Sequence, residues 1–318
     1  MTAIPRWRIA VIGAGAIGST LALRLASAGH DVTLVIRNDQ RRNQINTEGL
    51  IGKSANGAAE RASVRHTAAL DRDYDLLIVP VQRQQLDALI PVLAANGSAR
   101  ILLALNNATD TYTIDELLGA ERIVWGFPAI VARLQGDAVE YNIVPGYVQK
   151  TTLGRSDGRI TDDLRTIKAI FDGSGVPSVI TAQIDGWLKT HAAMVSPMVA
   201  AAFLPKRSGF GPLLGWSAAH RLASGIQTGL SAVKGTGAAV TPAPLRTLAL
   251  LPTVALTATI VAGFSAPPAK NLVTDVSGSV AAESALLLRQ LAVLARKAGI
   301  DPTPLTDLAT ALPDTKDH

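Results

Sequence analysis

A glycine-rich turn near the N-terminus most constrains how this chain can fold. The apolar residues 9–12 have the length of a β-strand and run directly into residues 13–18, which form a G-x-G-x-x-G motif. Residues 19–28 follow with apolar side chains at helical spacing, and residues 31–36 form a second apolar run of strand length. This order predicts a βαβ unit of about 30 residues, in which a helix connects two parallel strands.

Each glycine of this turn has a physical reason to be there. Gly13 permits the tight turn, Gly15 lets the backbone approach a pyrophosphate, and Gly18 lets the helix pack closely on the sheet. The N–H groups of Ala16 and Ile17 at the start of the helix face the phosphates, whose negative charge the helix dipole favours. The motif therefore predicts a dinucleotide site; the alternative is a glycine turn that holds no nucleotide.

The end of the second strand indicates which dinucleotide to expect. A carboxylate there accepts hydrogen bonds from the ribose 2′-hydroxyl of NAD, whereas an arginine accommodates the 2′-phosphate of NADP. Here the strand ends at Arg37, and Arg41 and Arg42 follow one turn later. The nearby acid, Asp39, lies past the usual position. Because a guanidinium binds phosphate through a planar fork of donors, we expect NADPH as the cofactor. The alternative is a solvated basic surface.

The hydrophobic pattern divides the chain into two parts. In residues 1–181, apolar runs of strand length alternate with amphipathic helices, which is typical of an α/β domain with a doubly wound, mostly parallel sheet. A strand-turn-strand pattern in residues 139–153 predicts a small antiparallel addition. Residues 182–318 show only helical patterns, the first over residues 183–203 with a kink expected at Pro197. We therefore predict a Rossmann-type nucleotide-binding domain followed by an all-α domain for substrate binding or dimerisation.

Composition excludes several classes of protein and site. The 318 residues are 48% hydrophobic and 17% charged, which argues against a disordered chain. Cysteine is absent, so disulfides and thiolate metal sites are excluded, and the five histidines lack the spacing of metal ligands; we expect no metal. The net charge of +5 comes without a run of Lys or Arg, so we expect a small anionic partner rather than a nucleic acid.

Two stretches have the composition of membrane signals. The N-terminus up to Ala28 has the form of a signal peptide, but the βαβ unit explains it better because Arg24 interrupts the apolar run. Residues 247–269 are uncharged and long enough to span a bilayer, yet they contain Pro252 and further prolines. We expect this stretch to be buried in the helical domain or in a homodimer interface, and we expect a cytoplasmic protein.

Hydride transfer to a carbonyl requires a group that donates a proton to the carbonyl oxygen. Lys189 is a candidate because it lies near the start of an otherwise apolar helix, where its ammonium can polarise the carbonyl and attract a carboxylate. The alternative is a lysine whose ammonium reaches solvent. Ala193, Ser196 and Pro197 follow at helical spacing, and these small residues predict room for a ligand.

Two further polar residues are candidates for the same site. Asn106 ends the apolar strand at residues 101–105, and such strand ends line the crevice where ligands bind in open α/β sheets. Glu283 lies among small apolar residues of a late helix, where a buried carboxylate is costly without a partner. We expect Glu283 to bind substrate hydroxyls or to orient Lys189; the alternative is an exposed surface glutamate.

In their order and spacing these motifs resemble the 2-dehydropantoate 2-reductase (ketopantoate reductase) family over nearly the whole chain. The resemblance rests on residues 13–18 with Arg37, Asn106, residues 187–189 and Glu283. It implies reduction of the 2-oxo acid ketopantoate to pantoate with NADPH, on the route to pantothenate. It also implies roles for three residues: Lys189 as general acid, Asn106 as an active-site residue at the nicotinamide, and Glu283 as a substrate-side group.

Several positions depart from the family pattern. Gln82 stands where the family commonly has a lysine, and Asn107 replaces a glycine after Asn106. Ala193 and Pro197 occupy the positions of two asparagines that contact substrate. The cofactor half and the proton donor are thus kept while the substrate half is changed, which makes a more apolar carbonyl a second candidate substrate. Two competing hypotheses are a non-catalytic NADP(H) sensor and a membrane-associated reductase of an apolar carbonyl.

Overall fold

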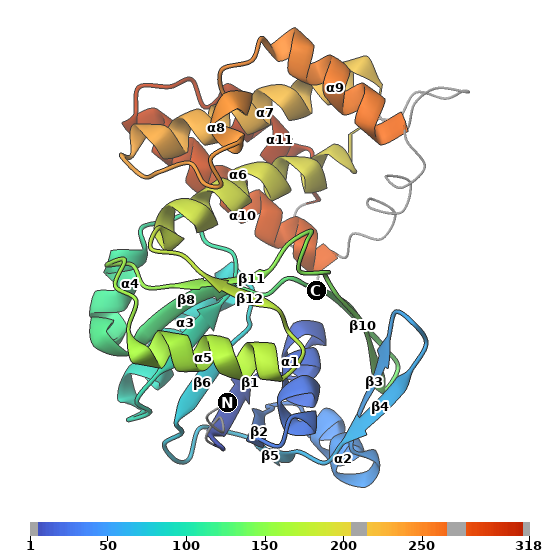
Figure 1. The fold of residues 1–318 in the computed structure, drawn as a ribbon. Coiled ribbons are helices and arrows are strands. Elements are labelled where there is room, and N and C mark those ends of the chain that lie inside the picture. Colours follow the sequence, from blue (N-terminus) through green and yellow to red (C-terminus); the bar gives the residue numbers. More distant parts are fainter. Residues whose placement is uncertain (1–5, 205–214, 266–277, 314–318) are drawn as a thin grey trace. The chain divides into compact units, whose positions relative to one another are not determined.

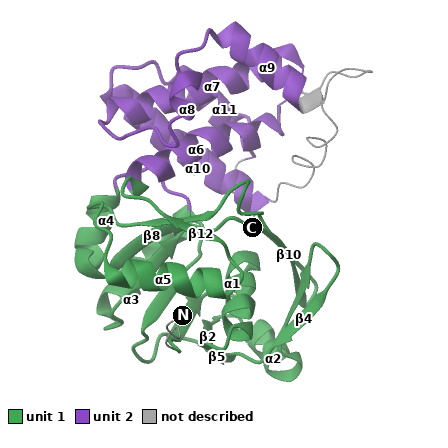
Figure 2. Cartoon of the chain, in the orientation of Figure 1, with its two compact units in different colours: residues 1–105, 111–184 green, residues 106–110, 185–318 purple. Residues whose placement is uncertain are grey.

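The computed structural model describes residues 6–204, 215–265 and 278–313 (Figure 1). The chain forms two compact units (Figure 2): unit 1 comprises residues 1–105 and 111–184, and unit 2 comprises residues 106–110 and 185–318. The boundary between the units lies between residues 184 and 185, whereas the sequence pattern predicted it between residues 181 and 182. The segment 106–110, which the sequence pattern assigned to the nucleotide-binding part, is grouped with the helices of unit 2.

Unit 1 contains an eight-stranded sheet in the order β12-β11-β8-β7-β6-β1-β2-β5. Its strands are β1 (Arg8–Ile12), β2 (Asp31–Val35), β5 (Arg65–Thr67), β6 (Leu76–Val79), β7 (Ile101–Ala104), β8 (Ile123–Phe127), β11 (Thr151–Gly154) and β12 (Ser178–Ile180). All neighbours pair in parallel except β8 and β11. The central strands β6 and β7 are buried at every residue, which explains their unbroken apolar runs. The predicted doubly wound α/β fold is confirmed.

Helices connect the strands of this sheet. They are α1 (Ala16–Ser27), α2 (Asp39–Glu48), α3 (Arg83–Ala95), α4 (Thr111–Leu118) and α5 (Asp162–Gly173), with a short 3-10 turn at Ala120–Arg122. In α5 the Thr161 hydroxyl accepts a hydrogen bond from the Leu164 N–H at 3.3 Å and caps the helix. Its apolar face then recurs at helical spacing through Ile167 and Phe171, which join α1 in one core beneath the sheet.

A second, four-stranded sheet has the order β4-β3-β10-β9. Its strands are β3 (Leu50–Ser54), β4 (Ala59–Ala62), β9 (Ile130–Gln135) and β10 (Ala138–Ile143). The strand pair expected in residues 139–153 is wrong in its pairing, because β10 pairs with β9 and β3 whereas β11 lies in the large sheet. The sequence did not indicate β9, since most of its side chains are exposed and no alternation marks it.

One partly buried carboxylate links this second sheet to α1. Arg24 of α1 donates from Nη1 to both oxygens of Glu60 in β4, at 3.0 and 2.8 Å. The Tyr141 hydroxyl of β10 donates to the same carboxylate at 2.6 Å. Burial, together with Glu60, raises the pKa of Tyr141 to about 12, so the phenol keeps its proton. Beside this cluster a Cβ on Gly52 would lie 2.2 Å from Leu23 Cδ2, which shows how closely β3 approaches α1.

Unit 2 is helical, as predicted. It contains α6 (Ile184–Ala201), α7 (Trp216–Gly235), α8 (Leu245–Leu248), α9 (Thr253–Ser265), α10 (Gly278–Lys297) and α11 (Thr303–Thr310). Helix α7 packs against α9, α10 and α11 around a core of leucine and alanine side chains. The sequence did not indicate α11, because Pro302 and Pro304 looked like signals that follow a helix. The two prolines instead lie at the start of α11, where a proline ring costs no backbone hydrogen bond.

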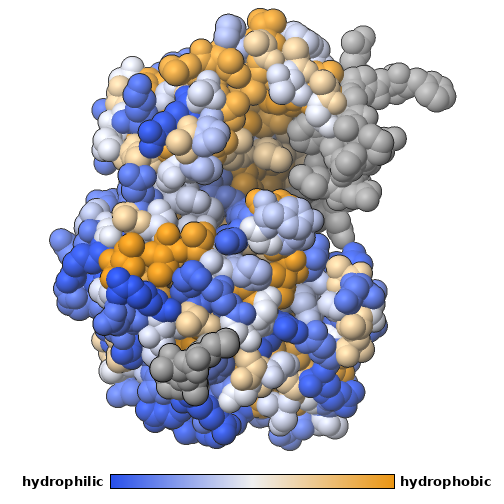
Figure 3. Space-filling view, in the orientation of Figure 1, coloured by the Kyte–Doolittle hydropathy of each residue, from blue (hydrophilic) through white to orange (hydrophobic). Residues whose placement is uncertain are grey.

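The apolar stretch 247–269 does not form one long helix. It divides between α8 and α9, and its last residues, 266–269, lie outside the described part of the chain. Apolar side chains reach the surface of unit 2 on the face that Figure 3 shows. In this stretch Leu250 and Val254 are 76% and 62% exposed. Among the described residues one helix, α10, is long and apolar enough to cross a membrane, and its Ala281, Leu288 and Leu291 are part of the core of unit 2.

We expect Glu60→Gln to loosen the second sheet. The variant keeps the shape of the side chain but leaves Arg24 without its charged acceptor, and the loss is moderated because both side chains are about a quarter exposed. The free energy of unfolding, measured from urea titrations, should fall by about 1–2 kcal/mol. Glu116→Gln, on the exposed face of α4, is the matched control and should stay within about 0.5 kcal/mol of the parent. Equal stability of the two variants would contradict the assigned role of Glu60.

Candidate functional site

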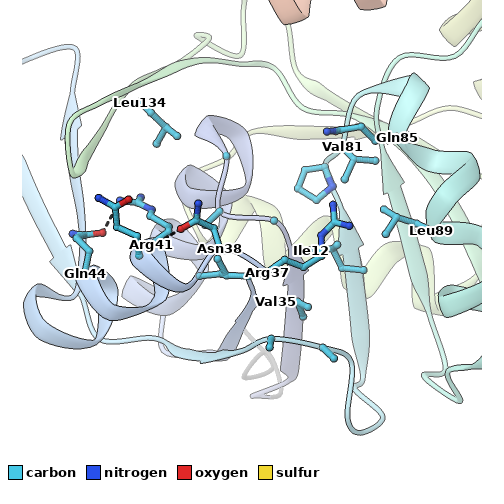
Figure 4. Close-up of a pocket in the computed structure, with 18 of the residues that line it drawn as sticks. Ile12, Val35, Arg37, Asn38, Arg41, Gln44, Val81, Gln85, Leu89 and Leu134 are labelled. Atoms are coloured by element: carbon cyan, nitrogen blue, oxygen red, sulfur yellow. Dashed lines mark hydrogen bonds between the residues drawn. The ribbon is translucent and has the colours of Figure 1, made fainter. Parts of the chain in front are cut away.

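A cavity of about 1150 Å³ opens in unit 1 where β1, β2 and β6 end (Figure 4). Its wall includes the glycine turn, the segment after β2, the first turns of α2 and α3, and the β9–β10 turn. The residues concerned include Gly13, Gly15, Arg37, Asn38, Arg41, Gln44, Val81, Gln85, Leu89, Leu134 and Asp137. The glycine turn was predicted to form such a site. The β9–β10 turn was not, because no local signal links it to a strand about 100 residues earlier in the chain.

The glycine turn has the geometry that the motif predicts. Gly13 has a φ of +93°, in the left-handed region that favours glycine. A Cβ on Gly18 would lie 2.2 Å from the Gly13 carbonyl oxygen, so only glycine lets α1 start this close to the strand. A Cβ on Gly15 would meet nothing within 4 Å, and its backbone is therefore open to a ligand. Ala16 and Ile17 form the first turn of α1, as expected.

The three arginines after β2 are not equivalent. Arg42 pairs with Asp39 and donates to the Ile36 carbonyl at 2.6 Å, so it braces its own loop. Arg41 donates to Gln44 at 2.6 Å and to the Asp137 carbonyl at 3.0 Å, and burial lowers its pKa (Figure 4). Arg37 lines the cavity and is exposed.

Within the described residues the Arg37 guanidinium makes no hydrogen bond or ion pair, which leaves its five N–H donors available to a ligand. It lies in the cavity wall beside Asn38. The Asn38 side chain accepts a hydrogen bond from the Arg41 N–H at 2.8 Å and so caps the N-terminus of α2. Of the expected cluster, Arg37 is therefore the residue best able to bind a phosphate group.

Gln82, at the first departure from the family pattern, has a structural function here. It precedes α3, where its N–H donates to Gln85 Oε1 at 3.0 Å, and its Oε1 accepts from Gln84 at 2.9 Å. The buried cation at the start of this helix is the next residue, Arg83, which pairs with Asp87 at 2.9 Å. Nothing in the sequence marked its burial, because a helical i,i+4 pair is ordinarily a surface feature.

In unit 2, Asn106 and Glu283 come together although 177 positions separate them. Asn106 Nδ2 donates to Glu283 Oε2 at 3.0 Å, and Glu283 is only 8% exposed, so it is no ordinary surface glutamate. Asn106 Oδ1 is buried and accepts no hydrogen bond from the described residues. The next residue is Asn107, at the position where the family has a glycine. Its Nδ2 donates to the Thr109 carbonyl, and its Oδ1 accepts from the Thr109 hydroxyl, so the two residues fix the segment 106–110.

Lys189 is buried, with 5% of its surface exposed, so the interpretation that its ammonium reaches solvent is wrong. Its Nζ lies 2.5 Å from Asp185 Oδ2, one turn earlier on α6. The sequence suggested Glu283 as the group that orients this lysine, whereas the contact in the structure is with Asp185. The i,i+4 spacing of an acid before a lysine is the signal that could have found it, but it is a weak one because such pairs are common on exposed helices.

The room expected beside Ala193 and Pro197 is not present. A Cβ on Gly229 of α7 would lie 2.9 Å from that of Ala193, and one on Gly225 would lie 3.6 Å from that of Pro197. Both α6 residues are buried, so this face of the helix packs directly on α7. Ser196 is fully buried as well, and its Oγ has no hydrogen-bond partner in the described part of the chain. These small residues serve helix packing, which hydrophobic spacing alone does not distinguish from a ligand site.

Residues 9–157 match the family model described as Ketopantoate reductase PanE/ApbA. The 2-dehydropantoate 2-reductase of Bacillus subtilis is 34% identical over 99 residues, which are 31% of this chain and 33% of that protein. A glycerol-3-phosphate dehydrogenase [NAD(P)+] of Parvibaculum lavamentivorans is 31% identical over 201 residues, 60% of this chain and 59% of that protein. The chain thus matches about a third and about three fifths of the length of these relatives.

Solved structures show the same fold over nearly the whole chain. The 2-dehydropantoate 2-reductase of Geobacter metallireducens GS-15 has a TM-score of 0.75 at 19% identity, covering 96% of this chain and 98% of that one. A ternary structure of D-mandelate dehydrogenase with NADH and anilino(oxo)acetate has a TM-score of 0.73 at 17% identity, covering 96% of each chain. The chain therefore resembles the ketopantoate reductase family in sequence over residues 9–157, and it shares the fold of these solved structures over nearly its whole length.

Proposed function

We propose that this chain is an NADPH-dependent reductase that converts a 2-oxo acid, ketopantoate or a related carbonyl compound, into the 2-hydroxy acid. The observation that carries the proposal is the buried Lys189 ammonium, held by Asp185 in the same unit as the Asn106–Glu283 pair. Burial of an ammonium is costly, so its retention here favours a chemical role. The match of residues 9–157 to the ketopantoate reductase model supports the class of reaction.

Features of unit 1 support NADPH as the cofactor. The open backbone at Gly15 and the N–H groups at the start of α1 suit a pyrophosphate. The guanidinium of Arg37, which is unpaired within the described residues, suits the 2′-phosphate that distinguishes NADPH from NADH. When bound, the dihydronicotinamide supplies the hydride; the chain's own residues have to bind and orient the substrate and provide the proton.

Lys189 is the proposed proton donor. As hydride reaches the carbonyl carbon, negative charge develops on the oxygen, and an ammonium can stabilise that charge and then donate its proton. The oxygen becomes the hydroxyl of the product, and the lysine is left as a neutral amine that regains a proton from solvent. The same positive charge attracts the carboxylate of a 2-oxo acid before the reaction.

Asn106 and Glu283 are the proposed substrate-side groups. The Asn106 Oδ1, which has no hydrogen-bond partner among the described residues, can accept from a substrate hydroxyl, and Glu283 fixes the amide that presents it. Ala193 and Pro197 are packed against α7 and offer no amide to a polar substrate. A carbonyl compound less polar than ketopantoate is therefore the second substrate to test.

The experiment that tests the proposal follows NADPH oxidation by absorbance with ketopantoate and a panel of 2-oxo acids and apolar ketones. Turnover of one or more of these compounds is the expected result. Tight NADPH binding without oxidation by the whole panel would favour a non-catalytic NADP(H) sensor instead. Comparison of ketopantoate with the bulkier and less polar compounds then assigns the substrate class.

Lys189→Ala should lower kcat by about 10²–10⁴-fold, which is the usual contribution of a general acid. The dissociation constant of NADPH, measured by fluorescence titration, should stay within about twofold. Lys234→Ala, an exposed lysine in the last turn of α7, is the control in the same unit and should be as active as the parent. A parallel loss of turnover and of NADPH binding in Lys189→Ala would argue against a role in proton transfer.

Arg37→Ala should raise the KM for NADPH by about 10- to 100-fold, because charge-assisted hydrogen bonds to the 2′-phosphate contribute roughly 1.5–3 kcal/mol. The KM for NADH should change little, since NADH has no 2′-phosphate. Arg61→Ala removes an exposed arginine of β4 and serves as the control for the change in net charge. If both cofactors lose affinity equally, Arg37 does not read the 2′-phosphate.

A further inference from the structure

The Lys189–Asp185 pair is more sheltered than other close ion pairs on helices. Its side chains are 7% and 19% exposed. Four further pairs at i,i+3 or i,i+4 spacing within the described residues each have a carboxylate at least 39% exposed, as in Lys168–Asp172 of α5. An exposed pair contributes little because water competes for both charges, whereas a sheltered pair keeps its geometry. Asp185 is thus placed to determine where the ammonium lies.

The first turn of α6, which carries Asp185, is itself held firmly. A Cβ on Gly186 would lie 2.4 Å from the Ala239 carbonyl oxygen, so the backbone of the loop after α7 lies directly against this turn. The Thr190 hydroxyl donates to the Gly186 carbonyl at 2.7 Å and accepts from the Thr241 N–H at 3.3 Å. Asp185 therefore projects from a rigid base, at a helix N-terminus whose dipole favours its negative charge.

We propose that Asp185 is a positioning residue for Lys189, holding the ammonium in the one rotamer from which it donates its proton. A free lysine side chain populates many rotamers, and ordering it only during the reaction would cost conformational entropy. The carboxylate removes most of that cost in advance, which is how preorganised sites gain rate. This inference rests on the proposed function, because it is carbonyl reduction that makes Lys189 the acid.

Asp185 and Glu283 thereby have different tasks. Glu283 accepts a hydrogen bond from the Asn106 amide at 3.0 Å, on the segment that follows β7. Asp185 accepts from the Lys189 ammonium, within α6 itself. Because Asp185 acts through Lys189, its removal should affect the chemical step more than the binding of cofactor.

The kinetic test compares Asp185→Asn and Asp185→Glu with the parent. Asp185→Asn should lower kcat by about 10- to 100-fold, the range expected when a catalytic group is misplaced, and leave the NADPH dissociation constant unchanged. Asp185→Glu, which restores the charge, should recover most of kcat. Asp162→Asn removes an exposed carboxylate from the first turn of α5 and is the matched control. A kcat within about twofold of the parent in Asp185→Asn, or equal losses in both variants, would overturn the proposal.

A second readout does not depend on turnover. In protein labelled with ¹⁵N-lysine, the Lys189 ammonium should give a separate NMR signal with slowed hydrogen exchange, assigned by its absence in Lys189→Arg. That signal should be lost or shifted to the position of the exposed lysines in Asp185→Asn, and unchanged in Asp162→Asn. An unaltered signal in Asp185→Asn would overturn the positioning role. A parent protein that shows the signal but oxidises no NADPH would contradict the proposed function while supporting the pair.

Discussion

Helix α1 starts against the first strand only because position 18 has no side chain, and much of unit 1 depends on that close approach. A Cβ there would meet the Gly13 carbonyl oxygen at 2.2 Å, and the turn could not keep its open face toward the cavity. Helix α1 then contacts both sheets of unit 1. Its apolar side packs on the large sheet, and Arg24 holds the second sheet through Glu60. The β9–β10 turn that closes the cavity belongs to that second sheet.

The departures from the family pattern have local physical explanations. Gln82 caps α3, and Asn107 fixes the segment 106–110 through Thr109, where a glycine would leave the backbone freer. Ala193 packs so closely on Gly229 that a larger amide would separate the two helices, and Pro197 is buried beside Gly225. In this structure these residues serve helix capping, packing and rigidity.

The charged side chains of the two units are held to different degrees. In unit 1 the Arg37 guanidinium, without a partner among the described residues, stands beside arginines already committed to their own loop. In unit 2 the buried charged groups Lys189 and Glu283 are held by Asp185 and Asn106. Buried charges persist in folded proteins when they are paired in this way, and a fixed geometry is what proton transfer requires. The pairing that lowers the cost of burying these charges also gives the fixed geometry that proton transfer needs.

By itself the sequence determined the βαβ unit, the doubly wound sheet and the helical second part, because periodicity and glycine chemistry act over a few residues. It also singled out Lys189, Asn106 and Glu283 as candidates, since polar groups in apolar surroundings are conspicuous. Only the tertiary structure decided their partners. The Asn106–Glu283 contact, the β9–β10 turn over the cavity and the packing of Ala193 on Gly229 join distant segments, and no local pattern encodes such pairings. The Asp185–Lys189 spacing is local, but its burial, which gives the pair its significance, comes from the helices and loops around it.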